Sequence, residues 1–407
     1  WLAGRGALTL AREFAMGFDQ TRKALAFLFR RQVERAAERK GYADRELEDL
    51  PAPLREAFAT DGAGGSVPVH DHFPGLDRLQ EALAAWKERG GRGSFLLSGE
   101  RGTGKSTWLA RIDPGDLPCT RITLDKRTWL ARDALRLHWE EIDPGAGAAP
   151  ASVREATDRL LAGPKRIIVV DAGQNLFLAS VGGFAAMETF ASLVDGTCRQ
   201  VYWVFSINAF TWAHVTAVRP DLKVFRDHQV LAAWNEEGIR GLIDARMKAS
   251  GVEATYEDLA GEGLRGLHGR ERDERLEQTR GAYVRLLWDY TDGNPRAAIY
   301  FWLESLVPEA AERVRVRAFR TPDPESLSAG GDPGLFVLGS IVLHENLSLA
   351  ELARVTRFPE GVVRTHVDRF HDMGVLQVED RRCRVTSRWH RAVVRRLRRS
   401  NLLPLVG

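Results

Sequence analysis

The residues with the clearest chemical potential form one glycine-rich run. The run is Gly99-Glu100-Arg101-Gly102-Thr103-Gly104-Lys105-Ser106, followed by Thr107, and it fits the pattern G-x-x-x-x-G-K-[ST]. Glycines let a backbone wrap closely around an anion, so that successive N–H groups point at phosphate oxygens. Lys105 would reach the β- and γ-phosphates, and the Ser106 hydroxyl would bind Mg²⁺. The run therefore predicts a site for ATP or ADP with Mg²⁺.

A second magnesium ligand is expected at the end of a neighbouring buried strand. The run 166–170 (RIIVV) is apolar and β-branched, and Asp171 follows it directly. This places the carboxylate at the carboxyl edge of a parallel sheet, where nucleotides bind. The spacing predicts that Asp171 and Ser106 bind the metal together.

The residue after Asp171 bears on how fast a nucleotide is hydrolysed. Many ATPases of this design have a glutamate there to polarise the attacking water, whereas this chain has Ala172. An alanine side chain neither takes up a proton nor orients water. We therefore expect slow hydrolysis, with Gln174 or a residue from outside the run positioning the water, and a protein that behaves as a nucleotide-dependent switch.

Two more segments carry polar groups suited to the same site. Ser206 and Asn208 lie at the end of the apolar run 201–207, where a polar side chain would contact the γ-phosphate or its water, or would instead cap the following helix. Farther along, Gly293-Asn294-Pro295-Arg296 opens a helical stretch, and Pro295 suits a first helical turn. The Arg296 guanidinium is well matched to phosphate oxygens.

The elements that would hold these residues alternate between strand and helix. Apolar runs of strand length lie at 94–98, 121–124, 166–170 and 201–207, with helical stretches such as 152–162 and 184–194 between them. This alternation predicts an α/β fold in which a parallel sheet carries helices on both faces.

The C-terminal residues 334–407 predict a separate small module. Helical stretches at 334–345, 348–355 and 359–373 precede strands at 375–378 and 383–386, and Ser348 and Glu351 have the spacing of a capping box. Three helices followed by a hairpin are typical of a winged helix. The module contains 13 arginines and 7 acidic residues.

Arginines on the expected third helix, wing tip and last helix favour DNA contacts within 359–399. They are Arg364, Arg369, Arg381, Arg382, Arg388, Arg391, Arg395, Arg396, Arg398 and Arg399. The alternative is that the module contacts another protein or the nucleotide-binding core of its own chain.

The ordered motifs resemble those of AAA+ ATPases, in particular the branch with replication initiators, origin-recognition ATPases and transposition-helper ATPases. Gly99–Ser106 and Asp171 match the Walker A and Walker B motifs, and Asp171-x-x-Gln174-Asn175-Leu176 is similar to the D-E-A-Q-N-L run of these families. The resemblance implies that the segment around Gly75 borders the adenine, that Asn208 is sensor 1 and that Arg296 is sensor 2.

The resemblance also implies an arginine finger that reaches a neighbouring subunit, and hence a homo-oligomer. Arg226 is the first candidate and Arg219 the second, although neither lies in the usual Ser-Arg context of the family. A surface arginine engaged in salt bridges is the alternative for both.

Four parts of the chain follow from these patterns. We expect an N-terminal helical segment and linker at 1–66, a P-loop core at 67–250, a helical lid with a mobile charged insertion (251–281) at 251–320, and the winged helix at 334–407. Residues 1–42 favour a helix packed on the body of the protein, with a membrane-surface or partner-binding helix as the alternative. Residues 321–333 are expected to be a second linker.

Composition limits the surroundings of the protein. The 407 residues have a net charge of +3 and only three cysteines, without a paired spacing, which favours a reducing compartment such as the cytoplasm. No apolar run is long enough to span a bilayer. A membrane link through residues upstream of Trp1 stays open.

Three functional classes remain. The first is an oligomeric ATP-dependent switch that acts on DNA or loads a partner onto it. The second is a STAND-type signalling or defence NTPase, in which the winged helix is regulatory and the N-terminal segment links to an effector or membrane. Gly293-Asn294-Pro295 also satisfies its G-x-P motif, although Arg296 favours AAA+. The third, a small-molecule kinase, lacks a recognisable acceptor site.

Overall fold

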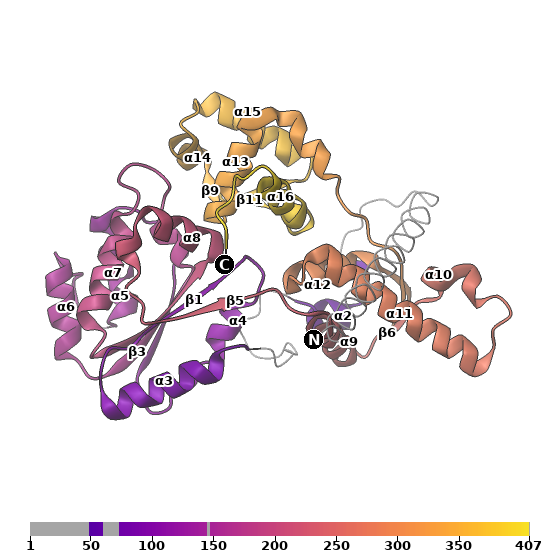
Figure 1. Cartoon of the computed structure of the whole chain (residues 1–407), viewed down its shortest axis with the longest axis horizontal. Coiled ribbons are helices and arrows are strands. Elements are labelled where there is room, and N and C mark those ends of the chain that lie inside the picture. The colour runs from indigo at the N-terminus through magenta and orange to yellow at the C-terminus, as the bar shows by residue number, and fades with distance from the viewer. Residues whose placement is uncertain (1–48, 60–72, 145–146, 407) are drawn as a thin grey trace, which may run out of the picture.

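A five-stranded parallel sheet forms the centre of the protein (Figure 1). The computed structural model describes residues 49–59, 73–144 and 147–406. The strand order is β2-β3-β4-β1-β5. The bounds are β1 Ser94–Gly99, β2 Cys119–Thr123, β3 Arg166–Asp171, β4 Val201–Asn208 and β5 Asp227–Leu231. The four strands expected from the sequence are confirmed, and β5 is added at one edge.

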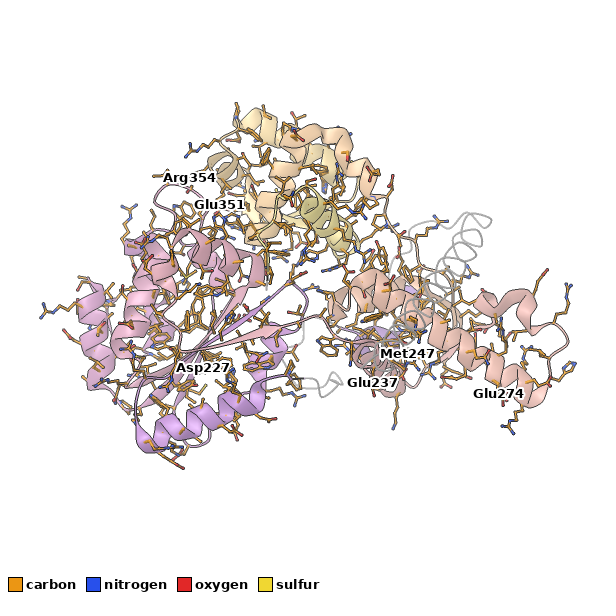
Figure 2. All side chains as sticks on the ribbon, viewed as in Figure 1. Asp227, Glu237, Met247, Glu274, Glu351 and Arg354 are labelled. Atoms are coloured by element: carbon orange, nitrogen blue, oxygen red, sulfur yellow. The ribbon has the colours of Figure 1, made fainter. Side chains whose placement is uncertain are left out.

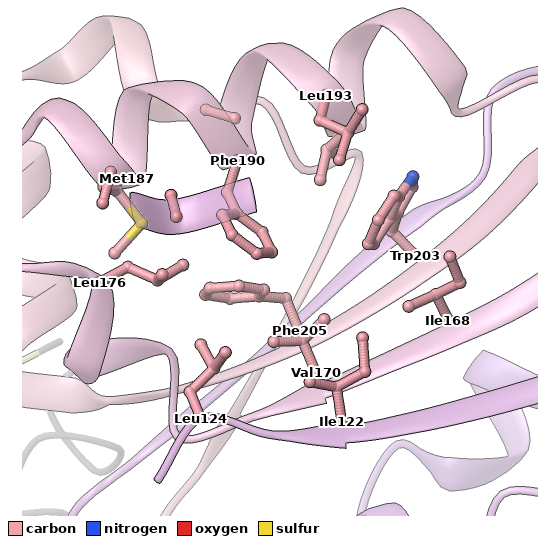
Figure 3. Close-up of a cluster of buried hydrophobic side chains, with 14 of the residues drawn as sticks. Ile122, Leu124, Ile168, Val170, Leu176, Met187, Phe190, Leu193, Trp203 and Phe205 are labelled. Atoms are coloured by element: carbon pink, nitrogen blue, oxygen red, sulfur yellow. The ribbon is translucent and has the colours of Figure 1, made fainter. Parts of the chain in front are cut away.

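Helices cover both faces of this sheet, which confirms the predicted α/β class. On one face lie α5 Ala131–Ile142, α6 Val153–Ala162, α7 Ala185–Thr197 and α8 Ala209–Val218. On the other lie α3 Leu76–Arg89 and α4 Lys105–Ala110. Figure 3 shows the first face, where Phe190 and Leu193 of α7 pack over Trp203 and Phe205 of β4. Successive strand residues serve opposite faces, so Val204 packs in the other core.

A second unit projects from the edge strand β5 and carries its own core. It contains α9 Glu236–Ser250, α10 Glu257–Ala260, α11 Gly269–Thr291 and α12 Pro295–Ser305, with a small sheet of order β6-β8-β7. The strands are β6 Glu253–Thr255, β7 Leu306–Ala310 and β8 Arg313–Val316. We call this unit the lid.

Two expectations about the lid were wrong. The stretch 251–281 is not an irregular insertion, because it contains β6, α10 and the start of α11, whose exposed first turns form ion pairs such as Arg272 with Glu257 at 2.8 Å. The region 306–316 is a strand pair, not helix, since Val314 and Val316 alternate with exposed or half-exposed arginines. Alternation of this kind suits a strand with one buried face.

The expected N-terminal linker also contains structure. Helix α2 (Ala52–Ala57) packs against α9 and buries Leu54, with Phe58 just beyond its end, in the lid core. Residues 49–59 therefore belong to the lid. The helix expected at 1–42 lies outside the described residues. Within the part of the chain that the structure describes, no helix combines the length and apolar character needed to cross a membrane.

The C-terminal module lies between the core and the lid (Figure 1). After the 3₁₀ helix Pro324–Gly330, which occupies most of the expected second linker, it contains α13 Gly331–His344, α14 Leu349–Thr356, α15 Glu360–Asp372 and α16 Ser387–Arg399. Its antiparallel sheet has the order β10-β11-β9, with β9 Leu347–Ser348, β10 Leu376–Glu379 and β11 Arg382–Val385. The capping box of Ser348 and Glu351 is confirmed.

Candidate nucleotide-binding site

The glycine-rich run joins the end of β1 to the start of α4. Gly102 and Gly104 have φ values of 86° and 98°, a left-handed conformation that favours glycine. A β-carbon on Gly102 would lie 2.7 Å from Asn294 Oδ1 of the lid. Lys105 Nζ donates to the carbonyl oxygens of Gly99 (3.0 Å) and Glu100 (3.1 Å), so its amine lies inside the loop. The run thus forms the loop that the motif predicts, closely covered by the lid.

The two expected magnesium ligands meet at this edge of the sheet. Ser106 Oγ donates to Asp171 Oδ2 at 2.6 Å. A hydroxyl and a carboxylate oxygen are hard ligands of the kind that Mg²⁺ prefers. The described residues contain no cluster of three or more His, Cys, Asp or Glu side chains that would hold a metal alone. The pair fits Mg²⁺ whose remaining ligands come from phosphates and water, as is usual for this ion with nucleotides.

The second oxygen of Asp171 is held by its neighbours. Ser206 donates its hydroxyl to Asp171 Oδ1, and the Ala172 N–H donates to the same atom at 2.8 Å. Ser206 therefore fixes the carboxylate, which differs from the phosphate contact expected of it. Ala172 has a left-handed φ of 61°.

The amides of Gln174 and Asn208 lie next to each other beside Asp171. The Asn208 N–H donates to Gln174 Oε1 at 3.2 Å, and Asn208 Oδ1 accepts from the Phe210 N–H at 2.8 Å. The expected capping of the next helix is therefore realised. Both amide NH₂ groups donate to Glu345, from Gln174 at 3.0 Å and from Asn208 at 2.8 Å. Sequence reasoning missed Glu345, because its place depends on how the C-terminal module docks.

The lid contributes the segment Gly293–Arg296 to the site. Asn294 Nδ2 donates to Arg101 O at 2.9 Å, and the Arg296 N–H donates to Gly102 O at 3.3 Å. Gly293, at φ 65°, has no room for a β-carbon because the Trp234 backbone lies against it. Among the described residues, the Arg296 guanidinium forms no ion pair within 4.0 Å, and we expect it to meet an anion.

The segment that begins at Phe73 lies beside the glycine-rich loop. Gly75, at φ 77°, precedes α3, and a β-carbon there would collide with Gln229 of β5. Trp108 of α4 donates to Pro74 O at 3.1 Å, and the Arg111 guanidinium lies 5.4 Å from the centre of the Phe73 ring. The structure thus holds Gly75 between β5 and α4. A contact of this segment with adenine stays a prediction.

Positive charge is concentrated around the loop. Burial lowers the pKa of Arg101 to about 10, with Arg296 and Arg384 acting in the same direction against Glu345. Burial also takes the pKa of His390 well below its usual range, aided by Arg101 and Arg391, so this imidazole is neutral. A buried arginine with other cations nearby favours an anionic ligand.

The arginine-finger candidates lie away from the site of their own chain. Arg226 is exposed and precedes β5, at the edge of the sheet opposite to the glycine-rich loop. Arg219 forms ion pairs with Glu188 and with Asp221, the latter at 2.6 Å, as the salt-bridge alternative expects. A contact of either arginine with a neighbouring subunit stays a prediction.

Most arginines of the last helix face the rest of the chain. Arg391, buried, donates to Glu100 at 2.7 Å and to Asp292 at 2.6 Å. Arg395 pairs with Asp292, Arg398 with Glu100 and Arg388 with Glu304. These side chains are engaged with the loop and the lid, which corrects the expectation that this helix offers them to DNA.

Near the wing, the arginines differ from one another. Arg382 donates to Glu351 at 3.0 Å and to Asn346 within the module, so it does not project from the tip. Arg364, Arg369 and Arg381 are exposed, and Arg364 forms an i,i+4 pair with Glu360 at 3.0 Å. Arg357, Arg384 and Arg399 are exposed too, so α15 and the turn at Arg381 form part of the arginine-bearing surface that remains exposed.

Comparison with known proteins gives structural similarity at low sequence identity. No family model and no curated protein matches the sequence. The structure is similar to the Aeropyrum pernix ORC2 protein (ADPNP-ADP complexes), with 11% identity, a TM-score of 0.40 and coverage of 85% of this chain and 98% of that one. It is also similar to CDC6P from Pyrobaculum aerophilum (13% identity, TM-score 0.39, coverage 86% and 98%) and to Drosophila ORC bound to DNA (13%, 0.37, 91% and 99%). At such identities and TM-scores the likeness by itself assigns no activity to this chain.

Proposed function

We propose that the protein is an AAA+ ATPase that binds ATP with Mg²⁺. The observation that carries the proposal is the meeting of Ser106 and Asp171 at 2.6 Å beside a loop whose lysine amine lies inside the phosphate cradle. These three groups come from distant parts of the sequence and supply the elements of phosphate and metal binding. A glycine-rich turn without function would have no reason to lie beside the carboxylate.

Each residue has a distinct task in this proposal. The loop N–H groups and Lys105 bind the phosphates, Ser106 and Asp171 bind the metal, and Arg296 approaches from the lid. Ser106 and Asp171 would hold Mg²⁺, which would supply positive charge against that of the phosphates. Ser206 keeps Asp171 in place through its hydrogen bond.

Hydrolysis is slow in this proposal. Ala172 supplies no carboxylate to activate water, and the amides of Gln174 and Asn208 orient water without accepting its proton. A site that binds a triphosphate firmly and cleaves it slowly suits a switch. The switch acts on DNA or loads a partner onto it, with the C-terminal module as a winged helix and Arg226 or Arg219 completing the site of a neighbouring subunit.

Calorimetry with ADP and a non-hydrolysable ATP analogue tests the binding proposal. Lys105→Ala removes a charged hydrogen-bond donor, which is worth about 1.5–3 kcal/mol, so the affinity should fall about 10- to 100-fold. Lys223→Ala, on the exposed loop before β5, is the matched control and should bind as the wild type does. Equal affinity of the Lys105 variant and the wild type would contradict the proposal.

One observation favours the second candidate, a STAND-type NTPase with a regulatory winged helix. The C-terminal module is bonded to the glycine-rich loop itself, through Arg391 and Arg398 on Glu100 and through Arg101 on Val385 O at 2.5 Å. A C-terminal module that is hydrogen-bonded to the glycine-rich loop would be suited to inhibit nucleotide exchange in its own chain. Particle mass with and without ATP separates the two, because ATP-dependent assembly favours the AAA+ switch, and a monomer that retains ADP favours the STAND type.

A further inference from the structure

The C-terminal module places one carboxylate on the groups that the proposed site offers to a third phosphate. Glu345 directly follows α13 and accepts hydrogen bonds from Gln174 Nε2 (3.0 Å) and Asn208 Nδ2 (2.8 Å). Its Oε1 atom also lies 3.8 Å from Lys105 Nζ, and its side chain is only 17% exposed. One amine and two amide donors therefore surround a negative charge that belongs to the protein.

The backbone on both sides of Glu345 is fixed to the core. Buried Arg127 donates to the carbonyl oxygens of His344 (2.7 Å) and Asn346 (3.0 Å). The same guanidinium donates to Gln174 O at 2.7 Å, which ties the segment that carries Glu345 to the segment that carries one of its donors. The placement of this carboxylate is thus set by several independent contacts.

Two further contacts hold the same segment. His344 Nε2 accepts from the Ala179 N–H at 3.0 Å, and its ring stacks on Phe177. Nearby, Arg354 of α14 donates to Ser180 Oγ and to Val181 O; Figure 2 shows Arg354 and Glu351 on the side of the module that faces the core. The interface extends well beyond the single carboxylate.

Glu345 has an unusual backbone conformation for its residue type. Its φ is 65°, in the left-handed region, which costs a non-glycine residue about 1 kcal/mol. Residues keep such conformations where their surroundings enforce them, and they cluster at functional sites. The strain is consistent with a carboxylate placed where it is used.

We propose that Glu345 makes the docked form of the site selective for a nucleoside diphosphate over a triphosphate. The inference rests on the proposed nucleotide binding. A third phosphate requires Lys105, Gln174 and Asn208, which Glu345 occupies, and two anions sharing these donors repel each other. A diphosphate ends at its β-phosphate, so it can share Lys105 and leave the two amide contacts of Glu345 intact.

The same geometry couples nucleotide binding to the C-terminal module. A triphosphate has to displace the Glu345 side chain, and its backbone is anchored through His344 and Asn346. Displacement therefore strains the docking of α13. By reciprocity, whatever loosens the module raises the affinity for the triphosphate.

The test compares ADP with a non-hydrolysable ATP analogue, each with Mg²⁺, on the full chain. Glu345→Gln keeps the shape and removes the charge, and Glu345→Ala removes the group. Both should strengthen binding of the analogue relative to ADP by about tenfold or more, while ADP affinity changes by less than about threefold. Glu360→Gln, exposed on α15, is the control and should leave the ratio unchanged.

Each other outcome is decisive. An unchanged ratio of the two affinities, with ADP still bound, overturns the role of Glu345 and leaves the proposed function standing. Loss of hydrolysis in Glu345→Gln without a change in the ratio does the same and assigns the carboxylate to water activation. A wild-type chain that takes up neither nucleotide refutes the proposed function together with this inference.

Discussion

The chemistry of the site depends on single atoms that other residues hold in place. Asp171 shows this best, because its two oxygens are divided between Ser106 on one side and Ser206 with the Ala172 N–H on the other. The carboxylate is therefore oriented before any metal binds. The next residue, Ala172, has a left-handed backbone conformation and only a methyl side chain, although the neighbouring groups suit hydrolysis.

Ala172→Glu should raise ATP turnover. Alanine already has a β-carbon at φ 61°, so the longer side chain adds little backbone strain, and a positioned general base contributes about 10²–10⁴-fold to a rate. We expect an increase of about tenfold to a hundredfold in phosphate release, with nucleotide affinity retained. Ala172→Gln, which has the same length but takes up no proton, is the control. Equal turnover of the glutamate variant and the wild type would show that the missing carboxylate does not limit the rate.

At the scale of elements, the end of α13 connects the module to the core through a neutral histidine. His344 Nδ1 lies 2.7 Å from Ser340 O and Nε2 accepts from the Ala179 N–H, which requires the proton on Nδ1 alone. Burial, with Arg127 and His214 nearby, takes the pKa of His344 well below its usual range. The folded chain therefore does not protonate this ring at pH values where the unfolded chain does.

Acid should weaken this contact. Below about pH 6.5 the His344 ring binds a proton in the unfolded state and stays neutral in the folded state. As the pH falls further, this group lowers the free energy of unfolding by up to about 1.4 kcal/mol per pH unit. His344→Gln does not titrate, and its loss of stability relative to wild type should be smaller at pH 5.5 than at pH 7.5 by about 1 kcal/mol. Urea unfolding at the two pH values measures the difference. An equal effect of His344→Gln at both pH values would contradict the assignment.

The sequence predicted elements where local pattern and burial agree. The strand β3 is an uninterrupted β-branched run, which is typical of a buried parallel strand. The strand β5 was missed because its first residues, Asp227-His228-Gln229, are polar and not buried at the sheet edge. The first half of α11 was assigned to a charged insertion because the charged residues of its exposed turns hide the helical period, whereas helix was expected from residue 282 onward. Local pattern carries no information about which distant segment covers a face.

The same limit applies to the site. Ser106 and Asp171 follow from a motif and a strand end, so their meeting was predictable. Glu345 has no local signal, because its position depends on the docking of α13 near Gln174 and Asn208. The arginines of α16 have the spacing expected of a DNA-binding helix. Only the fold shows that Arg391 instead donates to Glu100 and Asp292.

At the scale of the whole molecule, three units converge on one loop. Glu100 and Arg101 of the glycine-rich run bond to the C-terminal module, while Gly102 accepts from the lid. The lid and the C-terminal module therefore both contact the glycine-rich run that is proposed to bind the nucleotide. The proposed contact with DNA has to use what this arrangement leaves exposed, and α15 with the turn at Arg381 is the part of that surface where a winged helix is expected to meet DNA.

A surface of this size predicts weak DNA binding with a shallow salt dependence. Exposed Arg364, Arg369 and Arg381 would neutralise about three phosphates, so the logarithm of the affinity should fall with the logarithm of salt with a slope of about −3. Arg364→Ala or Arg381→Ala should each reduce the slope by about 1, because each removes one phosphate contact. Fluorescence anisotropy with a duplex, in ADP and in the ATP analogue, measures it, and Arg136→Ala on α5 is the control. A slope of about −8 would mean that the arginines of α16 have left Glu100 and Asp292 and that DNA binds an undocked module. No binding of the duplex with either nucleotide would remove DNA from the proposed function.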